Sequence, residues 1–194
     1  MRWLVRLLTA IAGAGFILGL LLLSAALYVY STIAPDLPAI EGLKDVRLEQ
    51  PMRVFSADGR LMAEFGVQLR EPVSYADTPE LLVKAFLAAE DSRFFEHRGI
   101  DPQAFVRAAR SYLRTGKPLQ GGSTITMQVA RNFFLTREKT LRRKFAEIIL
   151  ALRIERELSK QDILELYQNK IFFGHRAYGV SAAAKRYYDK TLED

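Results

Sequence analysis

The chain has 194 residues, of which 49% are hydrophobic, and its formal net charge is +6 at pH 7. This length allows one ordinary domain with appendages, and this hydrophobic content excludes a disordered chain. The absence of cysteine excludes thiol catalysis and cysteine–zinc sites, and the presence of only two histidines, His97 and His175, argues against a multi-histidine metal site.

The N-terminal segment from Leu7 to Tyr30 contains no charged residue. As a helix it would be about 36 Å long at ~1.5 Å per residue, which is enough to cross a bilayer core of about 30 Å. Arg2 and Arg6 precede the segment, whereas the first charged residues after it are acidic. We therefore predict a transmembrane anchor over residues 7–30, with residues 1–6 in the cytoplasm and the rest of the chain on the other side.

A cleaved signal peptide is the alternative interpretation of this segment, because the small residues Ser24, Ala25 and Ala26 could form a cleavage site. The apolar stretch is longer than the ~7–15 residues typical of signal peptides, which favours an uncleaved anchor. Export also changes the meaning of the positive charge. Nucleic acid is then not an expected partner, whereas anionic lipid head groups or a phosphorylated lipid are.

The residues after the anchor predict a linker followed by a β hairpin. Three prolines and no sustained periodicity indicate a juxtamembrane linker over residues 31–51. Within residues 53–65, Asp58-Gly59 separates two short apolar-rich runs, which is typical of a hairpin turn. We expect the strand content to end near Val73.

From Thr78 onward the sequence predicts helices, whose starts are marked by side chains that cap helix N-termini. Two of these side chains stand before a proline, which is favoured at the first helical position. The expected helices start at Thr78-Pro79; at Asp101-Pro102, ending near Gly116; at Ser123, ending near Asn132; at Thr136, ending near Leu158; at the capping box Ser159–Asp162, ending near Asn169; and at Val180, ending at Tyr188. The expected fold class is therefore mainly α with a small β hairpin, preceded by one transmembrane helix.

Two glutamates stand in unusual settings that suggest acid/base chemistry on a sugar. Glu90 falls at the end of the first expected helix, where a surface acid is the simpler interpretation. Glu147 lies on a helix that is apolar on both sides, with Arg143 and Lys144 one turn before it, so we expect it to be partly buried and paired with these cations. An ion pair that only fixes packing is the alternative. Two carboxylates in different environments can divide proton transfer and charge stabilisation at a glycosidic centre.

A basic run surrounds the approach to Glu147. Its members are Arg131, Arg137, Lys139, Arg142, Arg143 and Lys144. A run of this kind is usually a solvated face. Together with Gly121-Gly122-Ser123-Thr124, whose glycines expose backbone N–H groups at a helix start, it could instead bind a diphosphate. The glycine pair lacks the lysine and the spacing of a nucleotide P-loop.

Five groups of residues, in this order along the chain, resemble the motifs of the peptidoglycan glycosyltransferase domain of class A penicillin-binding proteins and of its single-domain relatives. The groups are Glu90-Asp91 with Phe94, His97 and Gly99; Gly121-Gly122-Ser123-Thr124-Ile125-Thr126 with Gln128 and Asn132; Arg143-Lys144 with Glu147; Ile163-Leu164-Glu165 with Tyr167 and Asn169; and Arg176-Ala177-Tyr178-Gly179-Val180 with Ala182-Ala183-Ala184. The details are most similar to the 1A branch of Gram-negative bacteria. The resemblance identifies residues 52–194 as the glycosyltransferase domain.

This resemblance implies a lysozyme-like α fold and an inverting transfer that builds β-1,4-linked glycan strands from lipid II, with release of undecaprenyl diphosphate. It implies that Glu90 is the general base that takes the proton from the acceptor's 4-hydroxyl. It implies that Glu147 assists departure of the lipid-linked diphosphate, directly or through a divalent cation such as Mg²⁺ or Mn²⁺. The positions that match donor-binding or diphosphate-binding residues are Ser123, Thr124, Gln128, Arg131, Arg143 and Lys144.

The sequence also departs from the family pattern. The differences are Met127 for a glutamine, Arg131 for a lysine, Gln168 for a leucine, Phe172 for a tyrosine, and Tyr188-Asp189-Lys190 at the end of the match. Arginine keeps the charge of lysine but presents a planar fork instead of a point charge. Because the match ends before the family's next helical segment and before any transpeptidase domain, we expect the domain to be C-terminally incomplete.

Two other classes of function remain as alternatives. A lysozyme-like glycan-cleaving enzyme or lytic transglycosylase could use a lone glutamate, but it does not need the arginine–lysine cluster or a lipid anchor. A non-catalytic membrane scaffold could bind lipid head groups through the basic run, and Glu90 would then be dispensable. For the leading interpretation, the expected partners are lipid II, the growing lipid-linked glycan chain, membrane lipids and other proteins of cell-wall synthesis. The expected location is the bacterial inner membrane, with the catalytic domain in the periplasm.

Overall fold

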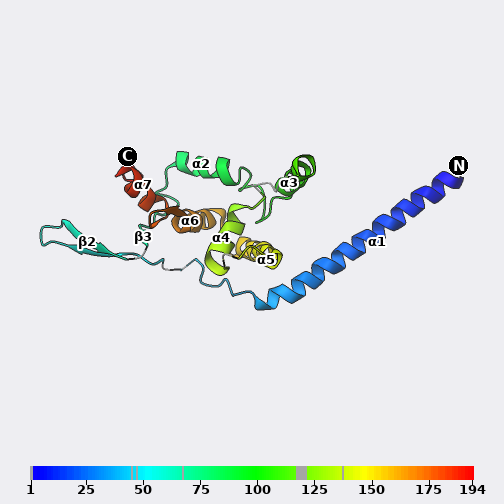
Figure 1. Cartoon of the computed structure of the whole chain (residues 1–194), viewed down its shortest axis with the longest axis horizontal. Helices are drawn as coiled ribbons and strands as arrows, with labels where there is room; N and C mark the ends of the chain where they lie inside the picture. Colours follow the sequence, from blue (N-terminus) through cyan, green and yellow to red (C-terminus); the bar gives the residue numbers. More distant parts are fainter. Residues whose placement is uncertain (1, 45, 47, 67, 117–121, 137) are drawn as a thin grey trace.

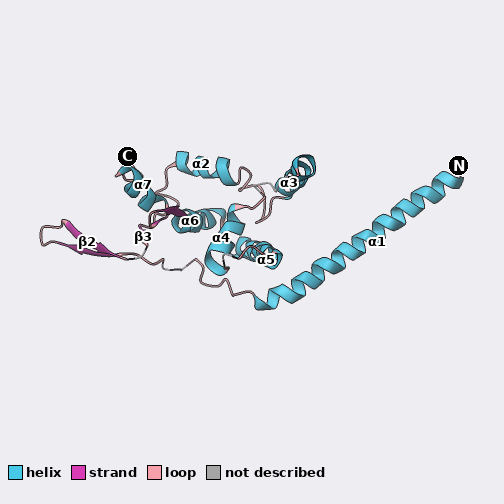
Figure 2. Cartoon of the chain, viewed as in Figure 1, coloured by secondary structure: helices cyan, strands magenta, loops and turns pink. Residues whose placement is uncertain are grey.

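The computed structural model describes residues 2–44, 46, 48–66, 68–116, 122–136 and 138–194. Helices make up most of it, and two small sheets accompany them (Figure 2). The expected fold class, mainly α with a β hairpin and one N-terminal apolar helix, is confirmed. Gly121 of the glycine pair and Arg137 of the basic run lie outside the described residues.

Helix α1 (Arg2–Ile33) is long and apolar enough to cross a membrane, judged by its length and composition. Figure 1 shows it extending away from the helical body. Its large apolar side chains are exposed along its length, except at its end, where Ile33 is buried together with Ala146 and Ile149 of helix α5 (Leu141–Glu157). The helix is therefore attached to the body through its last turn. Whether residues 7–30 span a bilayer stays a prediction.

The segment after α1 is partly built into the body. A single 3₁₀ turn, η1 (Ala34–Asp36), follows the helix, and Ile40 and Leu43 beyond it are buried in the main core. Arg142 Nη2 of α5 donates a hydrogen bond of 2.6 Å to Asp36 Oδ2. Part of the segment expected to be a linker thus fixes the end of α1 against the helices.

The hairpin is present at the predicted place. Strands β1 (Met52–Phe55) and β2 (Leu61–Phe65) pair in antiparallel fashion, with Met52 opposite Phe65. The turn between them is closed by the N–H of Gly59, which donates to the carbonyl of Ser56 at 2.9 Å. Gly59 has φ of +83°, a conformation that glycine adopts without steric cost.

A second sheet was not predicted. It has the order β3 (Leu69–Arg70), β5 (Ala177–Tyr178), β4 (Phe172–Gly174), with β3 and β5 parallel and β4 and β5 antiparallel. The expectation that strand content ends near Val73 was therefore wrong. The sheet connects the segment before α2 to the segment before α7 (Val180–Tyr188), and α7 has the predicted bounds.

Two other helices begin as their capping residues predict. Helix α3 (Pro102–Thr115) is capped by Asp101, which accepts from the N–H of Gln103, and it ends at Gly116 in the left-handed conformation. Helix α6 (Lys160–Lys170) begins with the capping box, in which the hydroxyl of Ser159 accepts from the N–H of Asp162 and the carboxylate of Asp162 accepts from the N–H of Ser159. The Asp101 cap and the Ser159–Asp162 capping box each accept hydrogen bonds from backbone N–H groups that the first helical turn leaves unpaired.

Three predicted caps were wrong. The first helix, α2 (Glu80–Glu90), has no side-chain cap, because the Thr78 hydroxyl donates instead to the carbonyl of Ser74. The starts of α4 and α5 lie later in the chain than predicted, and each helix is capped by a later threonine. Helix α4 (Ile125–Phe134) is capped by Thr124 instead of Ser123, and α5 is capped by Thr140 instead of Thr136.

The core lies where α4, α5 and α6 pack against one another, with one residue of α2 and two from the segment after α1 added to it. Its fully buried members include Ile125, Val129 and Ala130 of α4, Leu150 and Ile154 of α5, Ile163, Leu164 and Tyr167 of α6, and Phe94 of the loop after α2. Burial of each large apolar side chain stabilises the fold by roughly 1.5–3 kcal/mol. This core is the rigid support for the loops described next.

Candidate active site

Glu90 is the last residue of α2 and its side chain is exposed. One of its carboxylate oxygens, Oε2, accepts a hydrogen bond of 2.8 Å from Gln128 Nε2. The other end of the Gln128 amide accepts a bond of 3.4 Å from Arg131 Nη2. Gln128 and Arg131 lie one turn apart on α4, so one face of this helix holds the carboxylate while leaving it open to solvent.

A pocket of about 170 Å³ adjoins Glu90. Its walls come from the end of α2, the start of α3 and the residues before α4, and they consist of Ala88, Ala89, Glu90, Asp91, Ser92, Asp101, Ala104, Arg107, Ser123 and Thr124. The pocket thus brings Glu90 together with Ser123 and Thr124, which the sequence assigned to the donor side. Asp101 and Arg107 were not predicted as site residues, because the sequence shows only the capping role of Asp101 and gives no signal for Arg107.

Glu147 is buried in the middle of α5, and its side chain is 1% exposed. Arg143 Nη1 donates to Glu147 Oε1, and Lys144 Nζ donates to Oε2 at 3.1 Å. Both cations come from the preceding turn of the same helix. The expectation that Glu147 is at least partly buried and paired with these two cations is confirmed.

Lys144 connects Glu147 to the pocket beside Glu90. Its Nζ donates a second hydrogen bond, of 2.6 Å, to Ser123 Oγ, and Ser123 lines that pocket. The two positive charges of Arg143 and Lys144 exceed the single negative charge of Glu147. The contact at Ser123 therefore brings positive charge to the wall of a pocket that has an exposed carboxylate at its edge.

Two other described members of the basic run, Lys139 and Arg142, do not converge on this site. Arg142 pairs with Asp36 at 2.6 Å, and Lys139 is exposed. The run is thus divided between a surface contact to the segment after α1 and the two cations on Glu147. Among the described members of the run, the latter pair and Arg131 near Glu90 remain for the chemistry that the sequence suggested.

Asp91, directly after Glu90, is buried and holds two elements together. His97 Nε2 lies 3.0 Å from both of its carboxylate oxygens, and the N–H of Ile125 donates to Asp91 Oδ2 at 3.1 Å. An acceptor at the first N–H of α4 also complements the positive end of the helix dipole. Asp91 and His97 therefore fix the loop that follows Glu90 to the start of α4.

A second connection runs through Gly99 and Thr124. The hydroxyl of Thr124 donates to the carbonyl of Gly99 at 2.6 Å while it accepts from the N–H of Met127. Gly99 has φ of +85°, and a Cβ atom there would lie 2.9 Å from the carbonyl oxygen of Ala151. Only glycine fits between this loop and α5 without displacement of the backbone. The Thr124 hydroxyl is thus engaged in the fold, although the residue lines the pocket.

Phe94 completes this loop. Its ring is fully buried, with Lys160 Nζ 4.3 Å from the ring centroid. Lys160 also pairs with Glu155 at 2.7 Å. Phe94 therefore anchors the loop after Glu90 in the core and has no access to the pocket.

Residues of the fourth and fifth motifs fix β3 and the segment between β3 and α2. Glu165 Oε2 accepts from the N–H of Tyr75 at 2.7 Å, and the Asn169 amide both accepts from the N–H and donates to the carbonyl of Val73. The carbonyl of Arg176 accepts from the N–H of Leu69, and the Tyr178 ring lies 4.7 Å from that of Phe172. In this structure these residues serve the fold.

Two predicted residues remain. Asn132 lies half-buried on α4, one residue after Arg131. Tyr167 is fully buried on α6, where its ring and that of Phe86 pack edge to face, with the centroids 5.5 Å apart. Among the described residues, its hydroxyl has no hydrogen-bond partner.

The described residues contain no group of three or more His, Cys, Asp or Glu side chains that could hold a metal ion. Both oxygens of Glu147 already accept from cations, so a divalent ion at this carboxylate would have to displace Arg143 or Lys144. The residues as arranged therefore do not fit a divalent cation there. The expected role of Mg²⁺ or Mn²⁺ stays a prediction.

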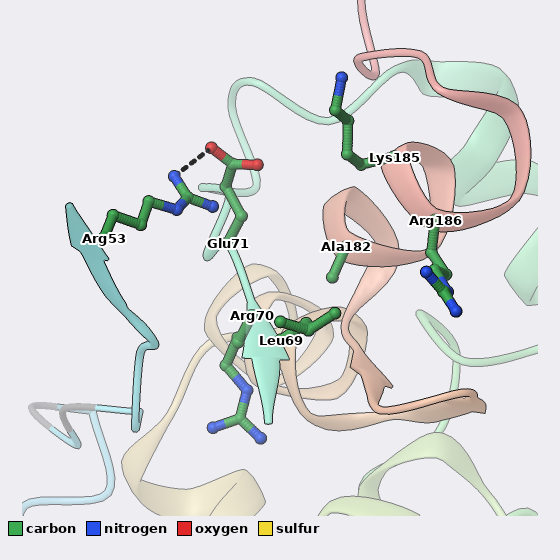
Figure 3. Close-up of a pocket in the computed structure, with 7 residues that line it drawn as sticks. All are labelled: Arg53, Leu69, Arg70, Glu71, Ala182, Lys185 and Arg186. Carbon is green, nitrogen blue, oxygen red and sulfur yellow. Dashed lines mark hydrogen bonds and ion pairs between the residues drawn. The ribbon is translucent and has the colours of Figure 1, made fainter. Parts of the chain in front are cut away.

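A second pocket, of about 210 Å³, lies among β3, α7 and Arg53 (Figure 3). Arg53 Nη1 lies 3.3 Å from Glu71 Oε1, and Figure 3 shows Arg70 pointing away from this pair. Lys185 pairs with Asp189 at 2.6 Å. Two of the four cations that line the pocket, Arg53 and Lys185, are thus paired with carboxylates, and the lining contains no residue predicted for the active site.

Comparisons with known proteins give a consistent result. A family model described as transglycosylase matches residues 58–194. Penicillin-binding protein 1A of Escherichia coli is 53% identical over 181 residues, which cover 93% of this chain and 20% of that protein. The protein of the same name from Pseudomonas aeruginosa is 49% identical over 178 residues, which cover 92% and 21%. The chain thus spans about a fifth of the length of these relatives.

A solved structure is also similar in sequence. It is the crystal structure of penicillin-binding protein 1A from Haemophilus influenzae, which is 30% identical and is matched over 77% of this chain and 12% of its own length. The TM-score of this match is 0.33.

Proposed function

Because the chain belongs to the transglycosylase family, we propose that it is the glycosyltransferase domain of a membrane-anchored peptidoglycan polymerase. Its substrates are lipid II and the growing lipid-linked glycan chain, and its products are a β-1,4-linked glycan strand and undecaprenyl diphosphate. The observation that carries this proposal is the Lys144 bridge between buried Glu147 and Ser123, because Ser123 lines the pocket beside exposed Glu90.

Glu90 is the general base in this proposal. Its carboxylate takes the proton of the acceptor's 4-hydroxyl as that oxygen attacks the anomeric carbon of the donor, and the bond from this carbon to the diphosphate oxygen breaks with inversion. The exposure of Glu90 supports this role, because a base must reach the hydroxyl within about 2.6–3.2 Å. Gln128 fixes one carboxylate oxygen and leaves the other available.

Arg143 and Lys144 stabilise the leaving diphosphate. As the bond breaks, the electron pair stays on the diphosphate, and positive groups that are already in place lower the energy of that charge. Burial of Glu147 beside the two cations supports this role, because the carboxylate holds both of them in position. Glu147 thus acts through the two cations, and Ser123, Arg131 and Gln128 provide further polar contacts for the donor.

Helix α1 is proposed to hold this site at the membrane where lipid II resides. Its length and apolar surface support a membrane span, and Arg2 and Arg6 before the apolar stretch support a cytoplasmic N-terminus. The catalytic domain then faces the periplasm at the bacterial inner membrane. Membrane lipids and other proteins of cell-wall synthesis are the further partners in this proposal, and nucleic acid is not one.

A comparison of two substrates tests the proposed reaction. The protein, in detergent or in vesicles, is supplied with lipid II in one arm and with finished glycan in the other, and products are separated by size. Growth of polymer from lipid II without release of fragments from glycan is the expected result. Fragments from finished glycan without polymer would instead identify a glycan-cleaving enzyme, and neither product would favour a membrane scaffold.

A further inference from the structure

The hydroxyl of Tyr167 is a buried polar group that the proposed mechanism does not use. The residue is fully buried on α6, and within the part of the chain that the structure describes its hydroxyl finds no hydrogen-bond partner. A buried donor without a partner is costly, and such groups in native structures usually have a reason that involves a ligand, a water or a second state. Packing alone would be served equally well by phenylalanine.

The surroundings of Tyr167 belong to the proposed base. Its ring packs edge to face with that of Phe86 on α2, with the ring centroids 5.5 Å apart at an angle of 89°. Glu90 follows Phe86 by one turn and therefore lies on the same face of α2. Helix α4 also packs against α6 and carries Gln128 and Arg131. Gln128 donates the hydrogen bond that holds Glu90. Tyr167 thus lies on the helix that packs against α4 and touches α2, the two helices between which Glu90 is held.

The electrostatics agree with this placement. Burial raises the pKa of the Tyr167 phenol strongly, the negative charge of Glu90 raises it further, and the positive charge of Arg131 opposes the shift. The phenol keeps its proton at every pH at which the enzyme would work, so it is available as a hydrogen-bond donor.

We propose that Tyr167 is a positioning residue that donates a hydrogen bond to the Glu90 carboxylate, directly or through one water, when the base turns toward the acceptor hydroxyl. Gln128 holds Oε2 in the structure, which leaves Oε1 for this bond. Two donors would then fix the plane of the carboxylate. This inference rests on the proposed role of Glu90.

The test is Tyr167→Phe in the full protein, assayed for polymerisation of lipid II. The substitution keeps the ring and its contact with Phe86 and removes only the hydroxyl. We expect kcat to fall roughly 10- to 100-fold, as for loss of a hydrogen bond to a charged group, while KM stays within about twofold and the melting temperature does not fall. Unchanged kcat would overturn the proposal. A loss of kcat that comes with a lower melting temperature or an equal rise in KM would also overturn it.

Tyr187→Phe is the matched control. The Tyr187 hydroxyl is exposed and bonded, since it donates to the carbonyl of Phe173 at 2.8 Å and lies 3.0 Å from His175 Nδ1. Its removal should lower the melting temperature slightly and leave kcat unchanged. Glu90→Gln separates the two levels of inference. If that variant is inactive while Tyr167→Phe is fully active, only the role of Tyr167 is wrong. If Glu90→Gln polymerises lipid II as fast as the parent, the role of Glu90 as base, on which this inference rests, is wrong, whereas a parent protein that makes no polymer would refute the proposed function itself.

Discussion

Replacement of Gly99 by alanine is expected to destabilise the protein by about 2–5 kcal/mol. The first contribution is conformational, because a φ of +85° costs a residue with a Cβ atom about 1–2 kcal/mol. The second is steric, because the Cβ would lie 2.9 Å from the carbonyl oxygen and 3.1 Å from the carbonyl carbon of Ala151 in α5, and relief of such overpacking costs about 1–3 kcal/mol. If the loop moves to relieve this contact, the bond from the Thr124 hydroxyl to the Gly99 carbonyl is weakened as well.

Urea denaturation of the detergent-solubilised protein measures this effect, with Gly116→Ala as the control. Gly116 has a similar φ of +65°, and no atom of the described residues lies within 4 Å of its Cβ position, so this variant should lose only the conformational contribution of about 1–2 kcal/mol. The difference between the two variants isolates the contact of the loop with α5. Equal losses for Gly99→Ala and Gly116→Ala would refute the close approach on which the placement of this loop rests.

Two further predictions concern buried and bonded carboxylates. Glu147→Gln should lower the free energy of unfolding by about 2–4 kcal/mol, since it leaves Arg143 and Lys144 without their partner. It should also abolish polymerisation. A variant as stable as the parent in urea would contradict the buried ion pair. The Ser159 hydroxyl, which donates to Asp162, is the main cause that lowers the pKa of Asp162 from its ordinary value of 3.8. The ionised carboxylate therefore stabilises the fold above pH 3.8. This contribution to stability disappears as the pH falls through the lower pKa of the folded state. Asp162→Asn should therefore be less stable than the parent at pH 7 and equally stable near pH 2, as followed by denaturation over a pH series, and a difference that stays constant with pH would exclude this role of the Ser159 bond.

The helices could be predicted from the sequence because their signals are local. Asp101 before a proline and the Ser159–Asp162 capping box act within one turn, and both were predicted correctly. The starts of α4 and α5 were misplaced because two hydroxyl residues compete at each start, Ser123 with Thr124 and Thr136 with Thr140. Propensity does not distinguish these pairs. At α4 the tertiary bond from Thr124 to Gly99 accompanies the choice, and it is invisible in the sequence.

The second sheet could not be predicted for a related reason. Its strands have two or three residues, too few to show any periodicity, and β3 pairs with β5 more than a hundred residues later. The candidate active site could be predicted from the sequence only in part. The sequence indicated burial of Glu147 and its pairing with Arg143 and Lys144, whereas the Gln128 bond to Glu90 and the Lys144 bond to Ser123 depend on how helices pack.

The most direct measurement of the role of Glu90 is the rate at which Glu90→Gln polymerises lipid II, compared with the parent protein and with Glu80→Gln. Glu80 lies at the opposite end of α2, exposed and paired with Lys84. Both variants should keep the stability of the parent within about 0.5 kcal/mol, as is usual for surface substitutions, and both should stay with the membrane fraction. We expect the rate of Glu90→Gln to fall by about 10²–10⁴-fold, the range for loss of a general base, and that of Glu80→Gln to be unchanged. A rate for Glu90→Gln equal to that of Glu80→Gln would show that Glu90 is not the base.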